Sequence, residues 1–214
     1  MELHERLLLK LGLTGGIASG KSAVGEMFVK LGARLIQSDV VARELMQPGR
    51  PVYVEVVRRF GREILNADGS INRSRLAESA FGSESPRFKE LNAIVHPSVI
   101  SEENNWMTKI GERDPKAIAI VEAALILEAG AAGRFDHLIV VTCQPEQRII
   151  RYAKRMGISE AAARAEVSRR MAAQISDEEK IKAADFVIDN SGALDATESQ
   201  VQRIFATLRP QANQ

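Results

Sequence analysis

The sequence predicts an α/β fold in which helices cover a parallel five-stranded sheet. The chain has 214 residues, enough for one sizeable core with room for a small insertion or lid. Most of its β-rich runs are apolar throughout rather than alternating, as in strands buried on both faces. Helical patterns separate them, which is typical of a layered α/β domain. The predicted strands are 7–14, 33–37, 117–123, 137–142 and 185–190.

The first helix is expected over 21–32, directly after a glycine-rich loop. Its apolar residues recur at helical spacing and fall on one face, and Gly32 can close its end. These residues are Val24, Met27, Phe28 and Leu31.

A long segment from about Ser38 to Pro115 contains no convincing strand and interrupts the alternation. It predicts helices over 51–61 and 72–82, separated by a turn at 66–70, and a long helix beginning near Ser85. The segment is either a helical layer of the same core or an inserted substrate domain. Its length favours the insertion.

The segment 145–180 predicts three further helices. Its signals are Pro145 for a first helical turn, Gly157 for a helix end, Ser159 for an N-cap, and Ser176 with Glu179 for a capping box.

Three arginines of this segment, Arg148, Arg151 and Arg155, are spaced to share one helix face. They form either a solvated basic face or part of a lid that lowers arginines onto phosphates. A run of charge alone favours the solvated face.

Composition restricts the partners. The 29 basic and 28 acidic residues are interspersed and leave a net charge of +1, so no broad surface for nucleic acid is expected. The single cysteine, Cys143, lies in an apolar run and excludes an internal disulfide. No stretch has the ~20 apolar residues of a membrane span, and the N-terminal apolar run does not fit a signal peptide. We therefore expect a cytoplasmic protein with neither nucleic acid nor membrane as a partner.

The stretch "TGGIASGKSA" at 14–23 carries the strongest signal for function. It completes the pattern G-x-x-x-x-G-K-[ST] between a predicted strand and a predicted helix. Such a loop turns its N–H groups and a helix N-terminus toward phosphates, while the lysine contacts the β and γ phosphates and the serine hydroxyl can bind Mg²⁺. The expected ATP-binding residues are Gly15, Gly16, Ile17, Ala18, Ser19, Gly20, Lys21, Ser22 and Ala23.

A phosphate loop alone does not identify the reaction, because GTPases, ATP-driven motors and small-molecule kinases share it. An N-K-x-D guanine reader is absent, which argues against a GTPase, and the L-S-G-G-Q signature of transport ATPases is absent too. Asp39 follows the second predicted strand, where it could orient an attacking hydroxyl and accept its proton. Equally, Asp39 or Ser38 could be a helix N-cap.

Several segments in order resemble the dephospho-CoA kinase family, over a range from Leu7 to about Leu208. They are "GLTGGIASGKSAV", the family's phosphate loop; "QSDVVAREL", its D-A-D-x-x-A-R element; "LNAIVHP", its L-x-x-I-x-H-P element; "AALILE", its P-L-L-F-E element; and "RRMAAQISDEEKIKAADFVIDNSG", its stretch from lid to last strand. The family transfers the γ-phosphoryl group of ATP to the ribose 3′-hydroxyl of dephospho-CoA, giving CoA and ADP as the last step of coenzyme A synthesis.

The resemblance implies a P-loop kinase core with a helical insertion and a lid. The core would comprise 1–37, 115–144 and 181–214, the CoA-substrate domain 38–114, and the lid 145–180. Asp39, Lys21 and Arg155 would be catalytic, and Asp39, Arg43, His96, Arg155 and Arg170 would contact the substrate. Ser22 would bind Mg²⁺. On this resemblance the arginine-bearing segment is a lid rather than a solvated face.

The chain departs from the family pattern at several positions. Gln37 stands where the family has the first aspartate of D-A-D, which puts any role shared by two carboxylates in doubt. Ala18 replaces a common loop glycine and Ala23 a common threonine, changes expected to leave the loop intact. Glu122 stands where many members have aspartate, and is either a metal ligand through water or a helix-initiating acid.

The expected activity is therefore an ATP- and Mg²⁺-dependent phosphotransfer to dephospho-CoA. The alternatives are another small P-loop kinase acting on a nucleoside or similar alcohol, and a nucleotide-binding regulator with no acceptor. The sequence leaves the oligomeric state open.

Overall fold

The computed structural model describes residues 8–81 and 87–213 and divides into two compact units. The first contains Met1–Ile36 and Met107–Gln214, and the second contains Gln37–Trp106.

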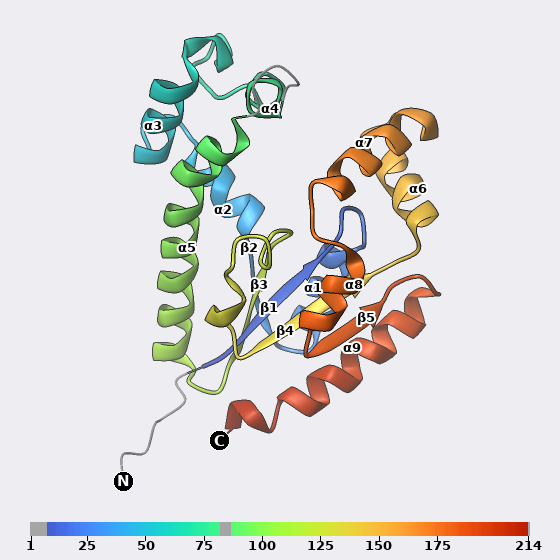
Figure 1. The fold of residues 1–214 in the computed structure, drawn as a ribbon. Helices are drawn as coiled ribbons and strands as arrows, with labels where there is room; N and C mark the ends of the chain where they lie inside the picture. The colour runs from blue at the N-terminus through green and yellow to red at the C-terminus, as the bar shows by residue number, and fades with distance from the viewer. Residues whose placement is uncertain (1–7, 82–86, 214) are drawn as a thin grey trace. The chain divides into compact units, whose positions relative to one another are not determined.

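A five-stranded parallel sheet forms the centre of the first unit (Figure 1). Its strands are β1 (Leu9–Gly15), β2 (Arg34–Gln37), β3 (Ile118–Glu122), β4 (His137–Thr142) and β5 (Phe186–Asp189). They lie in the order β2-β3-β1-β4-β5. The α/β class and all five predicted strands are confirmed, with bounds that differ from the predicted ones by two residues at most.

The two faces of the sheet are covered differently. Helices α1 (Lys21–Lys30) and α9 (Leu194–Leu208) pack together on one face over the side chains of alternate strand positions such as Leu11, Ile120 and Ile139. The intervening positions of β4, Leu138 and Val140, face the turn-rich segment 123–136, which includes η2 (Ala132–Arg134). The inner strands β1, β3 and β4 are therefore largely buried on both sides, which explains their nearly continuous apolar runs.

The three helices predicted over 145–180 are α6 (Pro145–Met156), α7 (Glu160–Ala172) and α8 (Asp177–Ala183). Their predicted end signals are confirmed. Gly157 ends α6 in the left-handed conformation, with φ 66°. Ser159 accepts a hydrogen bond from the Ala162 N–H, and Ser176 forms a capping box with Glu179. The first unit ends in η3 (Gln211–Asn213).

The second unit is helical. Its elements are α2 (Ser38–Leu45), α3 (Pro51–Phe60), η1 (Arg62–Ile64), α4 (Arg73–Phe81) and the first part of α5 (Phe88–Arg113). The helices predicted at 51–61 and 72–82 are confirmed. The long helix is present, although its predicted start near Ser85 lies outside the described residues. In the described part of the chain, no helix combines the length and the hydropathy needed to cross a membrane.

Candidate active site

The glycine loop connects β1 to α1 at the carboxyl end of the central strand. Gly15 is the last residue of β1, Gly20 is the N-cap of α1, and the first helical turn begins with Lys21, Ser22 and Ala23. The nine predicted nucleotide-binding residues therefore form one continuous strand–loop–helix turn, with the helix N-terminus directed at the loop. Such a turn presents backbone N–H groups to an anion.

Gly20 shows why this loop needs glycine. Its φ of +96° is strained for any side chain, and a Cβ there would lie 2.1 Å from Nδ2 of Asn190. That amide donates to the Ser19 carbonyl at 2.8 Å and its oxygen accepts from the Thr197 hydroxyl at 3.0 Å. Asn190 comes directly after β5 and braces the loop from a position 171 residues away. Asn190 was not among the predicted site residues, although its place at the carboxyl end of a predicted strand was a usable signal.

Ala18 also adopts a left-handed backbone conformation, with φ 54°. The backbone turn survives the replacement of the family glycine, but an L-residue there costs about 1–2 kcal/mol relative to a right-handed conformation. Its methyl group packs against the apolar cluster that contains Ile17 and Tyr152. The loop is therefore intact but strained at this residue.

Lys21 extends its ammonium group back across the loop. Its Nζ donates to the carbonyl oxygens of Gly15 at 2.9 Å and Gly16 at 3.0 Å. The positive charge is therefore held over the same backbone that presents the N–H groups.

Ser22 and Glu122 form a pair of oxygen ligands beside the loop. The Ser22 hydroxyl donates to Glu122 Oε1 at 2.7 Å, and Glu122 is only 8% exposed at the end of β3. The register pairs Glu122 with Leu13 of β1, just before the loop. Hard oxygen ligands of this kind suit Mg²⁺, which is usually held by one or two protein groups together with phosphates and water. No helix begins at Glu122, so its interpretation as a helix-initiating acid is wrong.

Three or more His, Cys, Asp or Glu side chains do not gather into a metal cluster anywhere in the described residues. A metal at Ser22 and Glu122 would therefore depend on phosphate oxygens for its remaining ligands.

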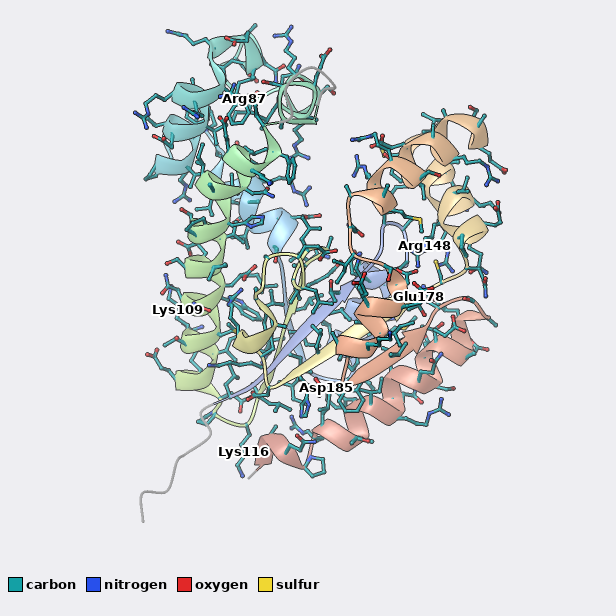
Figure 2. All side chains as sticks on the ribbon, viewed as in Figure 1. Arg87, Lys109, Lys116, Arg148, Glu178 and Asp185 are labelled. Atoms are coloured by element: carbon teal, nitrogen blue, oxygen red, sulfur yellow. The ribbon has the colours of Figure 1, made fainter. Side chains whose placement is uncertain are left out.

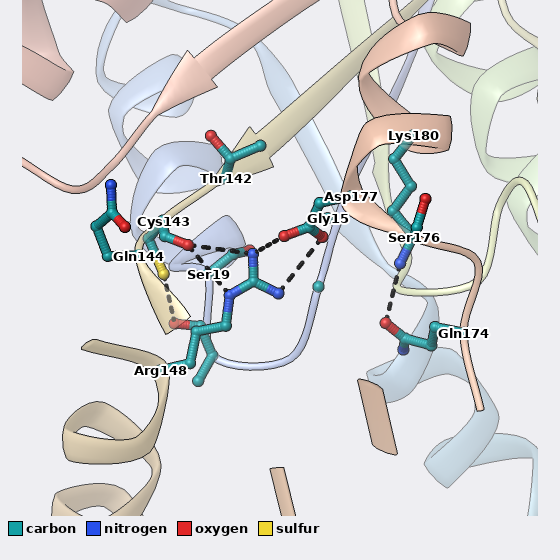
Figure 3. A network of polar contacts seen from close by, with 12 residues as sticks. Gly15, Ser19, Thr142, Cys143, Gln144, Arg148, Gln174, Ser176, Asp177 and Lys180 are labelled. Carbon is teal, nitrogen blue, oxygen red and sulfur yellow. Dashed lines mark hydrogen bonds and ion pairs between the residues drawn. The ribbon is translucent and has the colours of Figure 1, made fainter. Parts of the chain in front are cut away.

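Arg148, labelled in Figure 2, is a buried arginine of the first unit that lies close to the loop. The residue is 1% exposed, and its guanidinium donates to the Cys143 carbonyl at 3.2 and 3.3 Å and to both carboxylate oxygens of Asp177 (Figure 3). A Cβ on Gly16 would lie 2.2 Å from Nη1 of Arg148, so only glycine lets the loop approach this close. Arg148 therefore joins the start of α6 to the start of α8, and its guanidinium lies against Gly16 of the loop.

Arg151 is the second arginine of this face and also anchors the loop. It donates to the carbonyl oxygens of Ser19 at 3.3 Å and Asn190 at 2.9 Å. For Arg148 and Arg151 the solvated-face interpretation is wrong, because their guanidinium groups bond to backbone and carboxylate oxygens inside the unit.

Arg155 and Arg170, the two predicted lid arginines, converge on one aromatic ring. The guanidinium carbon of Arg155 lies 5.3 Å from the centre of the Tyr152 ring, and that of Arg170 lies 5.8 Å from it. Arg170 also donates through Nε to Glu166 at 2.6 Å. Hydrogen bonds from Arg169 and, secondarily, Arg170 hold the pKa of Glu166 below its usual value.

The predicted acceptor-side residues lie in the second unit. Asp39 is exposed in the first turn of α2, and Arg43 donates to its backbone carbonyl at 2.8 Å rather than to its carboxylate. Gln37 occupies the N-cap position without a side-chain hydrogen bond to the helix N–H groups. The interpretation of Asp39 or Ser38 as the N-cap is therefore wrong, and the Asp39 carboxylate is not used to cap α2.

Ser38 instead reaches a buried acid of α5. Its hydroxyl donates to Oε1 of Glu103 at 2.5 Å, and Glu103 is 2% exposed. Burial lowers the pKa of the half-buried His96 ring, and the nearby Glu103 charge opposes this shift. Sequence analysis named His96 but missed Glu103, since nothing in the local pattern distinguishes it from the exposed acid beside it.

A phosphate loop between the central strand and a helix, with a lysine, a serine and an acid at the next strand end, defines a P-loop nucleotide-binding protein of α/β fold. The chain belongs to the dephospho-CoA kinase family: the family model matches residues 9–196. It is thus an ATP-dependent kinase that phosphorylates an alcohol, and the family reaction is the final step of coenzyme A biosynthesis.

Individual relatives agree with this assignment. The chain is 39% identical over 203 residues to the dephospho-CoA kinase of Syntrophotalea carbinolica, covering 95% of this chain and 93% of the relative. Among solved structures, TT1252 from Thermus thermophilus matches with a TM-score of 0.76 and 30% identity, over 94% of this chain and 97% of that one. Dephospho-CoA kinase from Campylobacter jejuni, at 22% identity and TM-score 0.60 over 94% and 98%, shares the fold.

Proposed function

We propose that this protein transfers the γ-phosphoryl group of Mg²⁺-bound ATP to the ribose 3′-hydroxyl of dephospho-CoA, giving CoA and ADP in the cytoplasm. Family membership supports the reaction. The binding of Mg²⁺-ATP is supported by the Ser22–Glu122 hydrogen bond. This pair lies beside a phosphate loop whose carbonyl oxygens accept hydrogen bonds from Lys21.

On the donor side, the loop residues from Gly15 to Ala23 bind the ATP phosphates through backbone N–H groups and the α1 N-terminus. Lys21 exchanges its contacts with loop carbonyls for contacts with the β and γ phosphate oxygens. Because the ammonium is already held at the loop, the Lys21 side chain loses little further conformational freedom when ATP binds.

Ser22 and Glu122 fit Mg²⁺, because both present hard oxygen atoms within one hydrogen bond of each other. The ion supplies positive charge that offsets the charge on the phosphate oxygens. Glu122 positions the Ser22 hydroxyl and keeps its own carboxylate at the strand end, either as a ligand or through water.

On the acceptor side, Asp39 orients the 3′-hydroxyl and accepts its proton as the hydroxyl oxygen forms a bond to the γ phosphorus. The bond from that phosphorus to the oxygen of the departing ADP breaks in the same transfer. An exposed carboxylate that is not used to cap its own helix suits this role. Arg43 and His96 contact dephospho-CoA.

Arg155 and Arg170 neutralise the transferring phosphoryl group from the lid. Exposed guanidinium groups form paired hydrogen bonds to phosphate oxygens, and exclusion of water by a lid suppresses ATP hydrolysis.

The test is to incubate the purified protein with Mg²⁺-ATP and dephospho-CoA and to detect CoA by mass. The matched control acceptor is the 3′-deoxy analogue of dephospho-CoA, which should bind without being phosphorylated. Turnover of another alcohol but not of dephospho-CoA would point to a different P-loop kinase. ATP binding with no product from any alcohol would point to a regulator.

A further inference from the structure

The ring of Tyr152 lies beneath two arginines that come from different helices. Tyr152 belongs to α6 and is 4% exposed. Arg155 reaches it from one turn further along α6, and Arg170 from the last turn of α7. Their guanidinium carbons lie 5.3 and 5.8 Å from the ring centre, inside the distance of about 6 Å at which a cation is attracted to an aromatic face.

Carboxylates hold other arginines of the same two helices. Both terminal nitrogens of Arg164 donate to Glu146, at 2.9 and 2.6 Å. Arg169 donates twice to Glu166, at 2.9 and 2.8 Å. Such pairing immobilises a guanidinium but also occupies its donors and offsets its charge.

An aromatic ring attracts a guanidinium through the negative charge on its face, so it neither brings a carboxylate charge that offsets the cation nor offers an oxygen acceptor to its N–H donors. In the described part of the chain, no carboxylate pairs with Arg155. Arg170 uses only Nε toward Glu166, which leaves its terminal nitrogens without an acceptor among the described residues. The ring therefore orders two cations that remain able to bind an anion.

The same ring also packs toward the phosphate loop. Its apolar cluster contains Ile17 of the loop together with Val167 of α7, and Ala18 packs against that cluster. Tyr152 thus connects the loop that binds ATP with the helices that carry the two arginines.

We propose that Tyr152 is a positioning residue for phosphoryl transfer: it holds Arg155 and Arg170 at one place beside the loop while leaving the charge of Arg155, and the terminal N–H donors of both, available to the phosphoryl group. This inference rests on the proposed function, in which those two arginines contact that group.

The first experiment compares Tyr152→Phe, which keeps the aromatic face, with Tyr152→Leu, which keeps apolar bulk but lacks it. We expect Tyr152→Phe to retain kcat within about twofold and Tyr152→Leu to lower kcat about tenfold with a smaller change in the KM for ATP. Val167→Ala is the packing control, because it loosens the same cluster without touching either guanidinium. It should lower Tm yet leave kcat nearly unchanged.

Coupling to the arginines separates this inference from the proposed function. In an Arg155→Ala/Arg170→Ala background, adding Tyr152→Leu should cost less than about a further twofold in kcat. If the arginine variants alone leave kcat unchanged, the proposed role of the arginines fails, and this inference fails with it. Two other outcomes would overturn only the positioning role of Tyr152. In the first, the arginine variants lower kcat strongly but a folded Tyr152→Leu protein keeps its kcat. In the second, Tyr152→Leu lowers kcat by the same factor whether or not the two arginines are present.

A second series does not depend on whether the leucine variant folds. Phenylalanines with increasing numbers of ring fluorines, introduced at position 152, keep the shape of the side chain while weakening the negative face of the ring. A stepwise fall in kcat with fluorination supports the proposal. A flat series at constant Tm overturns it.

Discussion

The hydroxyl of Ser22 donates to Oε1 of Glu122 at 2.7 Å and so joins the first turn of α1 to the end of β3. The two residues are 100 positions apart in the chain. Their pairing places the carboxylate of Glu122 beside the serine of the phosphate loop.

Glu122→Gln should weaken the binding of Mg²⁺ at the candidate active site. The amide keeps the size of the side chain but loses its charge, and changes of this kind at metal sites typically cost about 10–100-fold in metal affinity or activity. We expect a higher Mg²⁺ concentration for half-maximal rate and a kcat at least about tenfold lower, whereas Glu122→Asp should retain more activity. The measurement is the rate as a function of free Mg²⁺, with Asp195→Asn, an exposed acid in the first turn of α9, as the control. An unchanged Mg²⁺ dependence would remove Glu122 from the metal site.

Asp39→Asn should abolish most turnover while ATP binding persists. If Asp39 accepts the proton of the 3′-hydroxyl, its loss lowers kcat by about 10²–10⁴-fold. ATP affinity should be nearly unchanged, because Asp39 contributes nothing to the phosphate loop. Glu44→Gln, another exposed acid of the same helix, is the matched control and should behave as the unmodified protein. Normal turnover of Asp39→Asn would exclude Asp39 from the reaction.

Lys21→Ala should damage both ATP affinity and rate, unlike Asp39→Asn. The lysine would contact phosphates in the ground state and in the transition state, so its removal affects binding as well as chemistry, with a loss in kcat of about 10²-fold or more. Calorimetric ATP binding together with kcat measures the two effects. Lys30→Ala, at the exposed far end of the same helix, should leave both intact. A near-normal rate for Lys21→Ala would contradict the assignment of the loop.

The stability of the protein should depend on pH partly through His96. Burial lowers the pKa of its ring, so folding favours the neutral form. The resulting stabilisation is complete above the ordinary pKa of histidine and is lost as the pH falls through the lower pKa of the folded state. Urea unfolding between about pH 7 and pH 5 should therefore show a smaller loss of stability for His96→Asn than for the unmodified protein. If the free energy of unfolding falls by the same amount with pH in His96→Asn and in the unmodified protein, His96 does not contribute to the pH dependence.

The strands and the phosphate loop were predictable because their signals are local. A strand buried on both faces has a continuous apolar run, and the loop requires glycine, lysine and serine at fixed spacing. The caps at Ser159 and Ser176 were predictable for the same reason, because each N-cap bonds to an N–H group three residues away.

The contacts that join distant segments were not predictable from the sequence. Asn190 supports Ser19 from 171 residues away, and Glu103 accepts from Ser38 across 65. Nor could spacing on one helix face distinguish the buried Arg148 from the exposed Arg155, because the difference depends on Asp177 in another helix. The spacing of charged residues can be seen in the sequence, whereas the groups that surround each charge are brought together only by the tertiary fold.

The Arg148–Asp177 pair should contribute strongly to stability, because one of its members is buried. Asp177→Ala leaves an almost fully buried guanidinium without its carboxylate, which typically costs about 3–5 kcal/mol. For a chain of this size we expect Tm to fall by roughly 6–20 °C. The double variant Arg148→Met/Asp177→Leu should recover much of this loss, because it removes the buried charge together with its partner. Glu178→Ala, the next residue of α8, is the control and should change Tm by only a few degrees. A Tm loss for Asp177→Ala no larger than that of Glu178→Ala would show that the pair does not hold α6 and α8 together.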